Sequence, residues 1–197
     1  MPGNDGGTLP APTLIHRTTD SHRMHQYAHI RPAAPEEASR LAVLATQVWL
    51  HTYATGGVSP EIAAHVLAEL TPARYAESLQ DPSVHVLVAA KDESLLGLAV
   101  LRHGEPCPTQ SPRSTVELQT LYVQEHFIGK GLGASLLHSA EAWARDRAQC
   151  PLWLTVNARN ERAIDFYRRH GYARAGTAYF ELGASRHENH VLVGGGA

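Results

Sequence analysis

The sequence predicts an α/β fold in which a mixed, mostly antiparallel central sheet is flanked by helices. Short apolar runs and apolar alternation, which are typical of strands, recur along the chain, and stretches with helical spacing separate them. The predicted order is one strand, several helices, three strands, a helix, a strand, a helix and two strands. The 197 residues, 43% of them hydrophobic, suffice for one domain with a sizeable core.

The N-terminal part of this fold is predicted to be mainly helical. A short strand over residues 27–32 ends at a proline, and residues 34–54 follow with apolar side chains at helical spacing. Pro60 suits the first turn of a second helix, which runs to about residue 70. A third, short helix is predicted over residues 71–79.

Strands dominate the remainder of the chain. The alternating segments 84–90 and 95–102 are predicted to form a hairpin around a polar turn, and a loop with three prolines then leads to a long strand. Asn160 is a suitable N-cap for the last helix, and Gly171 suits its C-terminal end. The remaining predicted elements are strand 116–123, helix 132–147, strand 152–156, helix 161–170, and strands 173–182 and 190–193.

Composition limits the domain organisation and the partners. We expect residues 1–26, rich in glycine, proline, threonine and histidine, to form a flexible leader, and residues 27–197 to form a single domain. The net charge of −2 argues against a nucleic-acid partner. Without a long apolar run or a signal-peptide core, the sequence predicts no membrane contact and a cytoplasmic location. Two cysteines and scattered histidines predict no disulfide framework and no metal site.

The most informative segment lies between the long strand and the helix that follows it. Gly129, Gly131 and Gly133 occur there at alternate positions. Glycine permits close approach of a ligand to the backbone, and a helix N-terminus offers unpaired N–H groups, so we expect a phosphate or pyrophosphate. The P-loop pattern fails because a glycine follows Lys130. A dinucleotide fingerprint is formally met, but its distance from the strand and the short chain that follows suit a doubly wound sheet poorly.

The same segment resembles the acetyl-CoA turn of the GNAT (GCN5-related) N-acetyltransferases. The family signature is Gln/Arg-x-x-Gly-x-Gly/Ala after a strand that ends near a Tyr-Val pair, and its positions are occupied by Ile128, Gly131 and Gly133. The family's second motif, Asn-x-x-Ala-x-x-x-Tyr followed by Gly-aromatic, is matched by Asn160, Ala163, Tyr167, Gly171 and Tyr172. The resemblance covers about residues 28–193 and implies the fold predicted above.

The flanking segments resemble one branch of the family, the PaiA-type polyamine N-acetyltransferases. That branch has a Thr-Tyr pair near the first helix, here within Trp49–Tyr53. It ends with Phe-x-Leu/Val-Gly, here residues 180–183, and a polar turn before the last strand, here residues 186–191. This resemblance implies a small cationic amine as acceptor.

The family resemblance implies acetyl-CoA as the acyl donor and no metal. The pantetheine arm would pair with the backbone near Leu121 and Val123 and would contact Asn160 and Ala163. Ile128 stands where the family usually has Gln or Arg, a departure that is compatible with cofactor binding if this residue acts mainly through its backbone N–H. The pyrophosphate would lie over Ile128, Gly129, Lys130, Gly131, Leu132, Gly133 and Ala134.

Two residues are candidates for proton transfer. Tyr167, carried by the family's helix motif, would donate a proton to the departing thiolate. Glu117 stands six residues before Val123, on the same strand face by period-two counting, and is the candidate general base.

The acceptor is expected between the first helices and the last strands. Aromatic contacts to an ammonium group could come from Trp49, His51 and Tyr53, and negative charge from Glu181 and Glu188. The sequence therefore predicts transfer of an acetyl group from acetyl-CoA to a primary amine, with a small cationic, polyamine-like molecule as acceptor. N-acetylation of a protein or peptide and a non-catalytic CoA-binding sensor remain as alternatives, and a homodimer is compatible with the resemblance.

Overall fold

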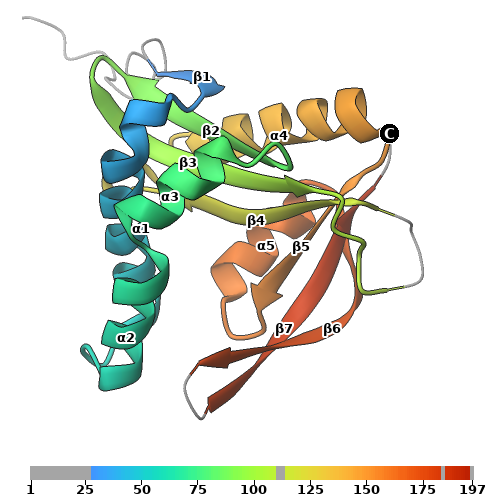
Figure 1. Cartoon of the computed structure of the whole chain (residues 1–197). Helices are drawn as coiled ribbons and strands as arrows, with labels where there is room; N and C mark the ends of the chain where they lie inside the picture. The colour runs from blue at the N-terminus through green and yellow to red at the C-terminus, as the bar shows by residue number, and fades with distance from the viewer. Residues whose placement is uncertain (1–27, 110–113, 183–184, 196–197) are drawn as a thin grey trace, which may run out of the picture.

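A seven-stranded sheet runs through the centre of the protein in the computed structural model, which describes residues 28–109, 114–182 and 185–195 (Figure 1). The strand order is β1-β2-β3-β4-β5-β7-β6, and neighbours are antiparallel except β4 and β5, which are parallel. The predicted mixed, mostly antiparallel sheet is therefore confirmed. The leader expected over residues 1–26 lies outside the described residues. Among the helices of those ranges, none has the length and apolar character needed to cross a membrane.

The elements follow the predicted order. The strands are β1 (His29–Pro32), β2 (Val84–Lys91), β3 (Ser94–His103), β4 (Val116–Val123), β5 (Leu152–Asn157), β6 (Tyr172–Leu182) and β7 (Ser185–Gly194). The α-helices are α1 (Ala38–Tyr53), α2 (Pro60–Glu69), α3 (Pro72–Gln80), α4 (Leu132–Ala148) and α5 (Glu161–Arg169). Two 3₁₀ turns, η2 (Pro35–Glu37) and η3 (Glu125–Phe127), precede α1 and the glycine turn.

The C-terminal hairpin differs from the prediction. β7 begins at Ser185 and pairs with β6 along its length, whereas only residues 190–193 were predicted as a strand, after a polar turn over residues 186–191. The predicted polar turn over residues 186–191 was therefore wrong. Near the tip, side chains on both faces of the hairpin are largely exposed, so burial does not impose the alternation of apolar and polar residues by which a strand is recognised.

Helix caps explain where several helices begin. The side chains of Ser59 and Thr71 accept hydrogen bonds from backbone N–H groups three residues later, at 3.3 and 3.2 Å. Asn160 does the same for α5, where its Oδ1 accepts from the N–H of Ala163 at 3.1 Å. Gly171 follows α5 with φ of 83°, a backbone conformation that favours glycine. The predicted cap and stop of α5 are thus confirmed.

Helices cover the two faces of the sheet and create two main cores. α4 and α5 pack on one face, where the buried side chains include Leu101, Leu136 and Leu154. α1 and α3 pack on the other face, over Val88 and Leu98. We call these the α4/α5 face and the α1/α3 face. This layering is interrupted within the sheet.

The interruption occurs between β4 and β5. These strands pair only at Val116↔Leu152 and Glu117↔Trp153, and then diverge. Two residues later β4 contains a bulge, because Val100 pairs with Thr120 while Leu101 pairs with Leu118, which leaves Gln119 as an extra residue. A bulge bends its strand and increases the local twist. The rest of β4 consequently keeps one backbone edge without a neighbouring strand.

A buried ion cluster anchors the start of α1. Glu37 is 1% exposed, and its carboxylate accepts hydrogen bonds from Arg31 at 2.7 and 2.8 Å, from Arg40 at 2.8 Å and from the Ala34 N–H at 2.8 Å. Hydrogen bonding from Arg31, opposed by burial, lowers the pKa of Glu37 from 4.5 to about 2. The cluster joins β1 to the N-terminus of the helix that later forms one wall of the site.

We predict that Glu37→Gln lowers the free energy of unfolding by about 3 kcal/mol at pH 7, because Arg31 and Arg40 lose their buried carboxylate partner. A carboxylate with a depressed pKa stabilises the fold fully above its unfolded pKa, here 4.5, and this contribution is lost as the pH falls toward 2. Urea unfolding should therefore show wild type and variant converging between pH 5 and pH 2.

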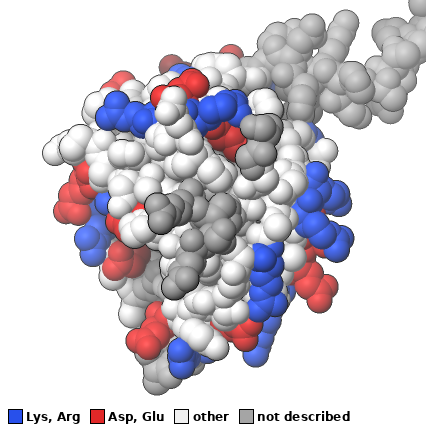
Figure 2. Space-filling view, turned by 90° about the vertical axis from the view of Figure 1, so that its right-hand side faces the viewer, with Lys and Arg blue, Asp and Glu red and all other residues white. Residues whose placement is uncertain are grey.

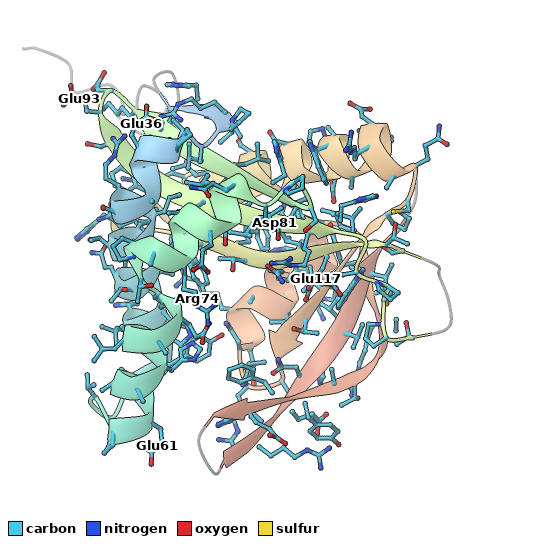
Figure 3. The ribbon with its side chains drawn as sticks, in the orientation of Figure 1. Glu36, Glu61, Arg74, Asp81, Glu93 and Glu117 are labelled. Carbon is cyan, nitrogen blue, oxygen red and sulfur yellow. The ribbon has the colours of Figure 1, made fainter. Side chains whose placement is uncertain are left out.

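The control is Glu36→Gln, which changes the exposed neighbouring carboxylate (Figure 3). It should alter the unfolding free energy by less than about 0.5 kcal/mol at any of these pH values. A gap between wild type and Glu37→Gln that stays constant from pH 7 to pH 3 would contradict the assigned role of the Glu37 charge.

Candidate active site

A cavity of about 750 Å³ lies at the end of β4. One wall is the C-terminal part of α1, the opposite wall is α5, and the floor is the end of β4 with the glycine turn. Of the residues predicted to bind the cofactor, all but Lys130 and Leu132 line the cavity. Those that line it are Leu121, Val123, Ile128, Gly129, Gly131, Gly133, Ala134, Asn160, Ala163 and Tyr167. Sequence motifs more than 30 residues apart thus converge on one space.

The free edge of β4 faces this space. The N–H of Gln124 donates to the carbonyl of Leu96 on β3, at 2.9 Å. Because backbone groups alternate between the two edges of a strand, those of Leu121 and Val123 point to the opposite edge, where β5 has diverged. An extended ligand with amide groups can pair with this edge as a further strand would.

The glycine turn presents unpaired N–H groups. Gly129 and Gly131 have φ of 75° and 79°, and Gly131 is the residue from which α4 starts. The first hydrogen bond inside α4 runs from the N–H of Ser135 to the carbonyl of Gly131, at 3.0 Å. The N–H groups of the three preceding residues therefore have no partner within the helix, and they favour an anion at this end.

The structure adds detail to three predicted contacts of the turn. The N–H of Ile128 donates to the carbonyl of Glu125 at 3.1 Å within η3, so in this structure it is not free to bind the cofactor as expected. The side chain of Lys130 lies outside the cavity lining, with its Nζ 5.2 Å from the ring centroid of Phe127. The side chain of Leu132 is buried in the core, but its N–H is one of the three unpaired groups at the start of α4 and can still face the cofactor. Local packing, which the signature spacing does not encode, decides each case.

Charged side chains in the cavity add to this anion preference. Arg162 and Arg169 line the wall formed by α5. Glu125 lies between two walls, with its Oε2 3.3 Å from Nε2 of His51 and 3.8 Å from Nη1 of Arg162. Helical spacing of Arg162, Phe166 and Arg169 could have revealed this wall from the sequence. On the face shown in Figure 2, positively and negatively charged side chains both lie around the edge of the molecule, so neither sign of charge dominates this face.

Tyr167 reaches the cavity from the inner side of α5. Its side chain is 8% exposed and packs against Phe166 and Tyr172, with ring centroids 5.2 and 5.5 Å apart. Burial raises the pKa of Tyr167, and the neighbouring Tyr53 raises it further. The phenol is therefore protonated at working pH and can donate its proton or a hydrogen bond into the cavity.

Glu117 lies near the centre of the molecule, at the last pair before β4 and β5 diverge (Figure 3). The expectation that it shares a strand face with Val123 was wrong, because the bulge at Gln119 reverses the alternation. Glu117 pairs with Arg102 and shares the α1/α3 face with Tyr122, whereas Leu121 and Val123 pack against the α4/α5 core. Burial raises the pKa of Glu117, and nearby Glu105 also raises it.

Aromatic rings form a chain on the α1/α3 side. Trp49 lies 5.0 Å from Tyr53 and stacks on His65 at 4.7 Å, and His65 meets Phe180 edge-on at 6.0 Å. The chain connects α1, α2 and β6. Tyr53 and His51 line the cavity, while Trp49 is buried behind them. His65 and Phe180 were not predicted, because only tertiary packing brings them together.

The two predicted acidic acceptor contacts lie elsewhere. Glu181 pairs with Arg186, and Glu188 pairs with Tyr179, so both share the face of β6 and β7 opposite to Phe180. Glu188 Oε1 lies 3.5 Å from Arg174. Neither residue is part of the cavity lining. Successive residues of a strand point to opposite faces, so the register of β6 and β7 decides which residues face the acceptor side. The prediction for Glu181 and Glu188 lacked this register.

Comparison with known proteins agrees with this geometry. Residues 49–172 match the acetyltransferase (GNAT) family. The chain belongs to this family. An uncharacterized N-acetyltransferase of Mycobacterium tuberculosis (strain H37Rv) is 39% identical over 137 residues, which cover 69% of this chain and 83% of that protein. The crystal structure of PaiA N-acetyltransferase from Thermoplasma acidophilum in complex with coenzyme A has a TM-score of 0.69 and 21% identity, covering 85% of this chain and 98% of that one.

As a GNAT enzyme, the protein is an acetyl-CoA-dependent acyltransferase. The cavity residues fit that donor, since an unpaired strand edge suits the amides of pantetheine and the start of α4 suits a diphosphate. Within the part of the chain that the structure describes, no group of three or more His, Cys, Asp or Glu residues is arranged to hold a metal ion.

We predict that Gly131→Ala weakens acetyl-CoA binding at least about tenfold, which corresponds to 1.4 kcal/mol. A Cβ at φ of 79° strains the backbone and turns the N–H groups that start α4 away from their present direction. Calorimetric titration with acetyl-CoA measures the change.

Gly104→Ala is the matched control. Gly104 has φ of 89°, nothing lies within 4 Å of a Cβ added there, and it is outside the cavity lining. This variant should suffer similar strain and keep its affinity. Equal affinities for both variants would show that the turn does not bind the diphosphate.

Proposed function

We propose that this enzyme acetylates the primary amine of a small cationic acceptor, such as a polyamine. The observation that supports a small acceptor is the contact between His65 on α2 and Phe180 on β6. It bridges the two elements between which an acceptor would enter, so it narrows the space available to an extended chain on this side. Acetylation of a protein or peptide needs an open groove for an extended chain, which this bridge disfavours.

Aromatic rings support the choice of a cation. Tyr53 and Phe180, whose side chains are exposed, offer ring faces and edges to an ammonium group, and such contacts contribute about 0.5–2 kcal/mol each. Burial lowers the pKa of His65, which keeps this ring neutral near pH 7 and avoids repulsion of a cation. A streptothricin acetyltransferase of Streptomyces lavendulae is 34% identical over 115 residues, covering 57% of each chain. Its name, and that of the PaiA neighbour, support an amine acceptor.

The proposed reaction uses both faces of the sheet. Acetyl-CoA would lie on the free edge of β4, with its diphosphate over residues 128–134 and its pantetheine amides on Leu121 and Val123. The amine would approach from the α1/α3 side, where Glu117 lies at the point of divergence. Holding thioester and amine together removes much of the entropic cost of their encounter.

The chemistry then has balanced proton transfers. Glu117, directly or through water, accepts a proton from the ammonium, and the free amine attacks the thioester carbon to form a tetrahedral intermediate. As the intermediate collapses, the C–S bond breaks and its electron pair stays on sulfur. Tyr167 donates its proton to that sulfur. The nitrogen, which became cationic on attack, loses its second proton, and this proton restores the phenol through solvent, while Glu117 releases the first proton to solvent. The products are the N-acetylated amine and coenzyme A.

The experiment is an assay of thiol release with a panel of amines. We expect spermidine to react with a kcat/KM at least about tenfold higher than glutamate or a short peptide with a free N-terminus, a difference of 1.4 kcal/mol. Preference for anionic amines would overturn the cationic acceptor, and preference for the peptide would favour the protein acetyltransferase. Acetyl-CoA binding without thiol release from any amine would favour a non-catalytic sensor.

We predict that Glu117→Gln lowers kcat/KM near neutral pH by about 10²-fold and removes the acidic limb of the pH–rate profile. In the wild type the rate should fall as the pH falls through the pKa of Glu117, since a protonated carboxyl cannot accept the proton. Because burial raises that pKa, the limb should lie above the ordinary glutamate value of 4.5.

Glu105→Gln provides the control, because Glu105 raises the pKa of Glu117 through charge repulsion. Removing this charge should keep the limb and move it to lower pH. An acidic limb that survives in Glu117→Gln would assign the base to another group.

A further inference from the structure

Tyr53 occupies a position that its expected role as an acceptor contact does not explain. It is the last residue of α1, and its ring packs beside Trp49. The same side chain lines the cofactor cavity, together with Asn160 and Tyr167 from α5. Tyr53 therefore spans from the aromatic chain on the acceptor side to the wall that carries the proposed acid.

The orientation of Asn160 determines what Tyr53 can donate. Asn160 Oδ1 accepts the capping hydrogen bond from the N–H of Ala163, at 3.1 Å. This bond fixes which end of the amide is oxygen, so the Nδ2 group is the end available to other partners. Tyr53 lines the cavity together with this side chain, and Asn160 acts to lower the pKa of the Tyr53 hydroxyl. Because Tyr53 and Asn160 line the same cavity, Asn160 Nδ2–H can donate to the phenol oxygen, which leaves the Tyr53 proton free to be donated into the cavity.

The two phenols lie close enough to influence each other. Tyr53 contributes to the raised pKa of Tyr167, and both hydroxyls border the same space. Burial also raises the pKa of Tyr53, whereas Asn160 opposes this effect by hydrogen bonding. Hydrogen bonds arranged in series polarise one another, so a Tyr53 hydroxyl that accepts from Asn160 becomes a better donor.

We propose that Tyr53 is a further catalytic residue, which donates a hydrogen bond to the sulfur of the thioester as the C–S bond breaks. The proposal rests on the proposed function, in which Tyr167 transfers the proton to that sulfur. In this arrangement Asn160 donates to Tyr53, and Tyr53 donates to the sulfur while its negative charge develops. Stabilisation of developing charge by a fixed donor is among the largest contributions to enzymatic rates.

The test compares Tyr53→Phe, Tyr167→Phe and the matched control Tyr75→Phe. Tyr75 is buried as Tyr167 is, but it belongs to the α1/α3 core and lies outside the cavity lining. Tyr53→Phe should lower kcat by about tenfold to 10²-fold with little change in acetyl-CoA affinity, and Tyr167→Phe by about 10²-fold or more. Tyr75→Phe should keep kcat. Thermal unfolding of each variant shows whether the fold is retained.

Asn160→Ser tests the relay, because serine keeps a cap for α5 but loses the Nδ2 donor. If Asn160 acts through Tyr53, the double variant with Tyr53→Phe should lose no more kcat than Tyr53→Phe alone. Losses that multiply would show that the two residues act independently and would overturn the relay.

A binding measurement separates failure of this proposal from failure of the proposed function. The probes are coenzyme A and desulfo-coenzyme A, titrated by calorimetry at pH 9, where the thiol is partly ionised. The wild type should prefer coenzyme A, and Tyr53→Phe should lose most of that preference, whether or not any amine is acetylated. Unchanged preference together with unchanged kcat would overturn the role of Tyr53, while thiol release by the wild type would leave the acetyltransferase proposal standing.

Discussion

The divergence of β4 and β5 is the constraint on which the rest of the site depends. Parallel neighbours normally continue their ladder, but here only two residue pairs form. The bulge at Gln119 bends β4 immediately afterwards, and a strand edge is left with hydrogen-bonding groups that the sheet does not satisfy. A cofactor rich in amides can satisfy them. The same irregularity that weakens the sheet thus creates the binding edge.

In the proposed reaction the bulge also separates two chemical tasks. Leu121 and Val123, after Gln119, pack on the α4/α5 face and are the residues whose backbone we propose to bind the cofactor, whereas Glu117 lies on the opposite face with Arg102 and Tyr122. Without the extra residue, Glu117 would lie on the same face as Val123 and would point into the core beneath α4. A half-buried carboxylate at the point of divergence can instead meet an acceptor from the α1/α3 side. Its raised pKa follows from that partial burial.

α1 connects the stability of the fold to the geometry of the site. Its N-terminal end is held by the buried Glu37 cluster, and its middle packs over β3. Its C-terminal end carries His51 and Tyr53 into the cavity, where further contacts reach η3 and α5. Gln47 adds a hydrogen bond with Gln124 at 3.0 Å. A side-chain position near the reacting atoms therefore depends on contacts at the other end of the helix.

Local chemistry explains why so much of this protein could be predicted. The glycine turn, the Asn160 cap and the Tyr167 helix face follow from residues close in sequence, since dihedral preferences, caps and helical spacing act over a few residues. Element order, and with it the fold class, followed from the same short-range patterns. The exposed C-terminal hairpin was the exception, because no buried face imposed alternation there.

The sequence by itself thus determined the fold class, the cofactor turn and the helix that carries Tyr167. Only the tertiary structure decided which strand faces the remaining side chains occupy. Glu117 changed face because of one bulged residue, Glu181 and Glu188 were turned away by the register of β6 and β7, and Ile128 lost its free N–H to η3. The contact of His65 with Phe180 joins residues 115 positions apart. Register, bulges and long-range packing depend on the whole chain's competition for burial and hydrogen bonds, which no local pattern encodes.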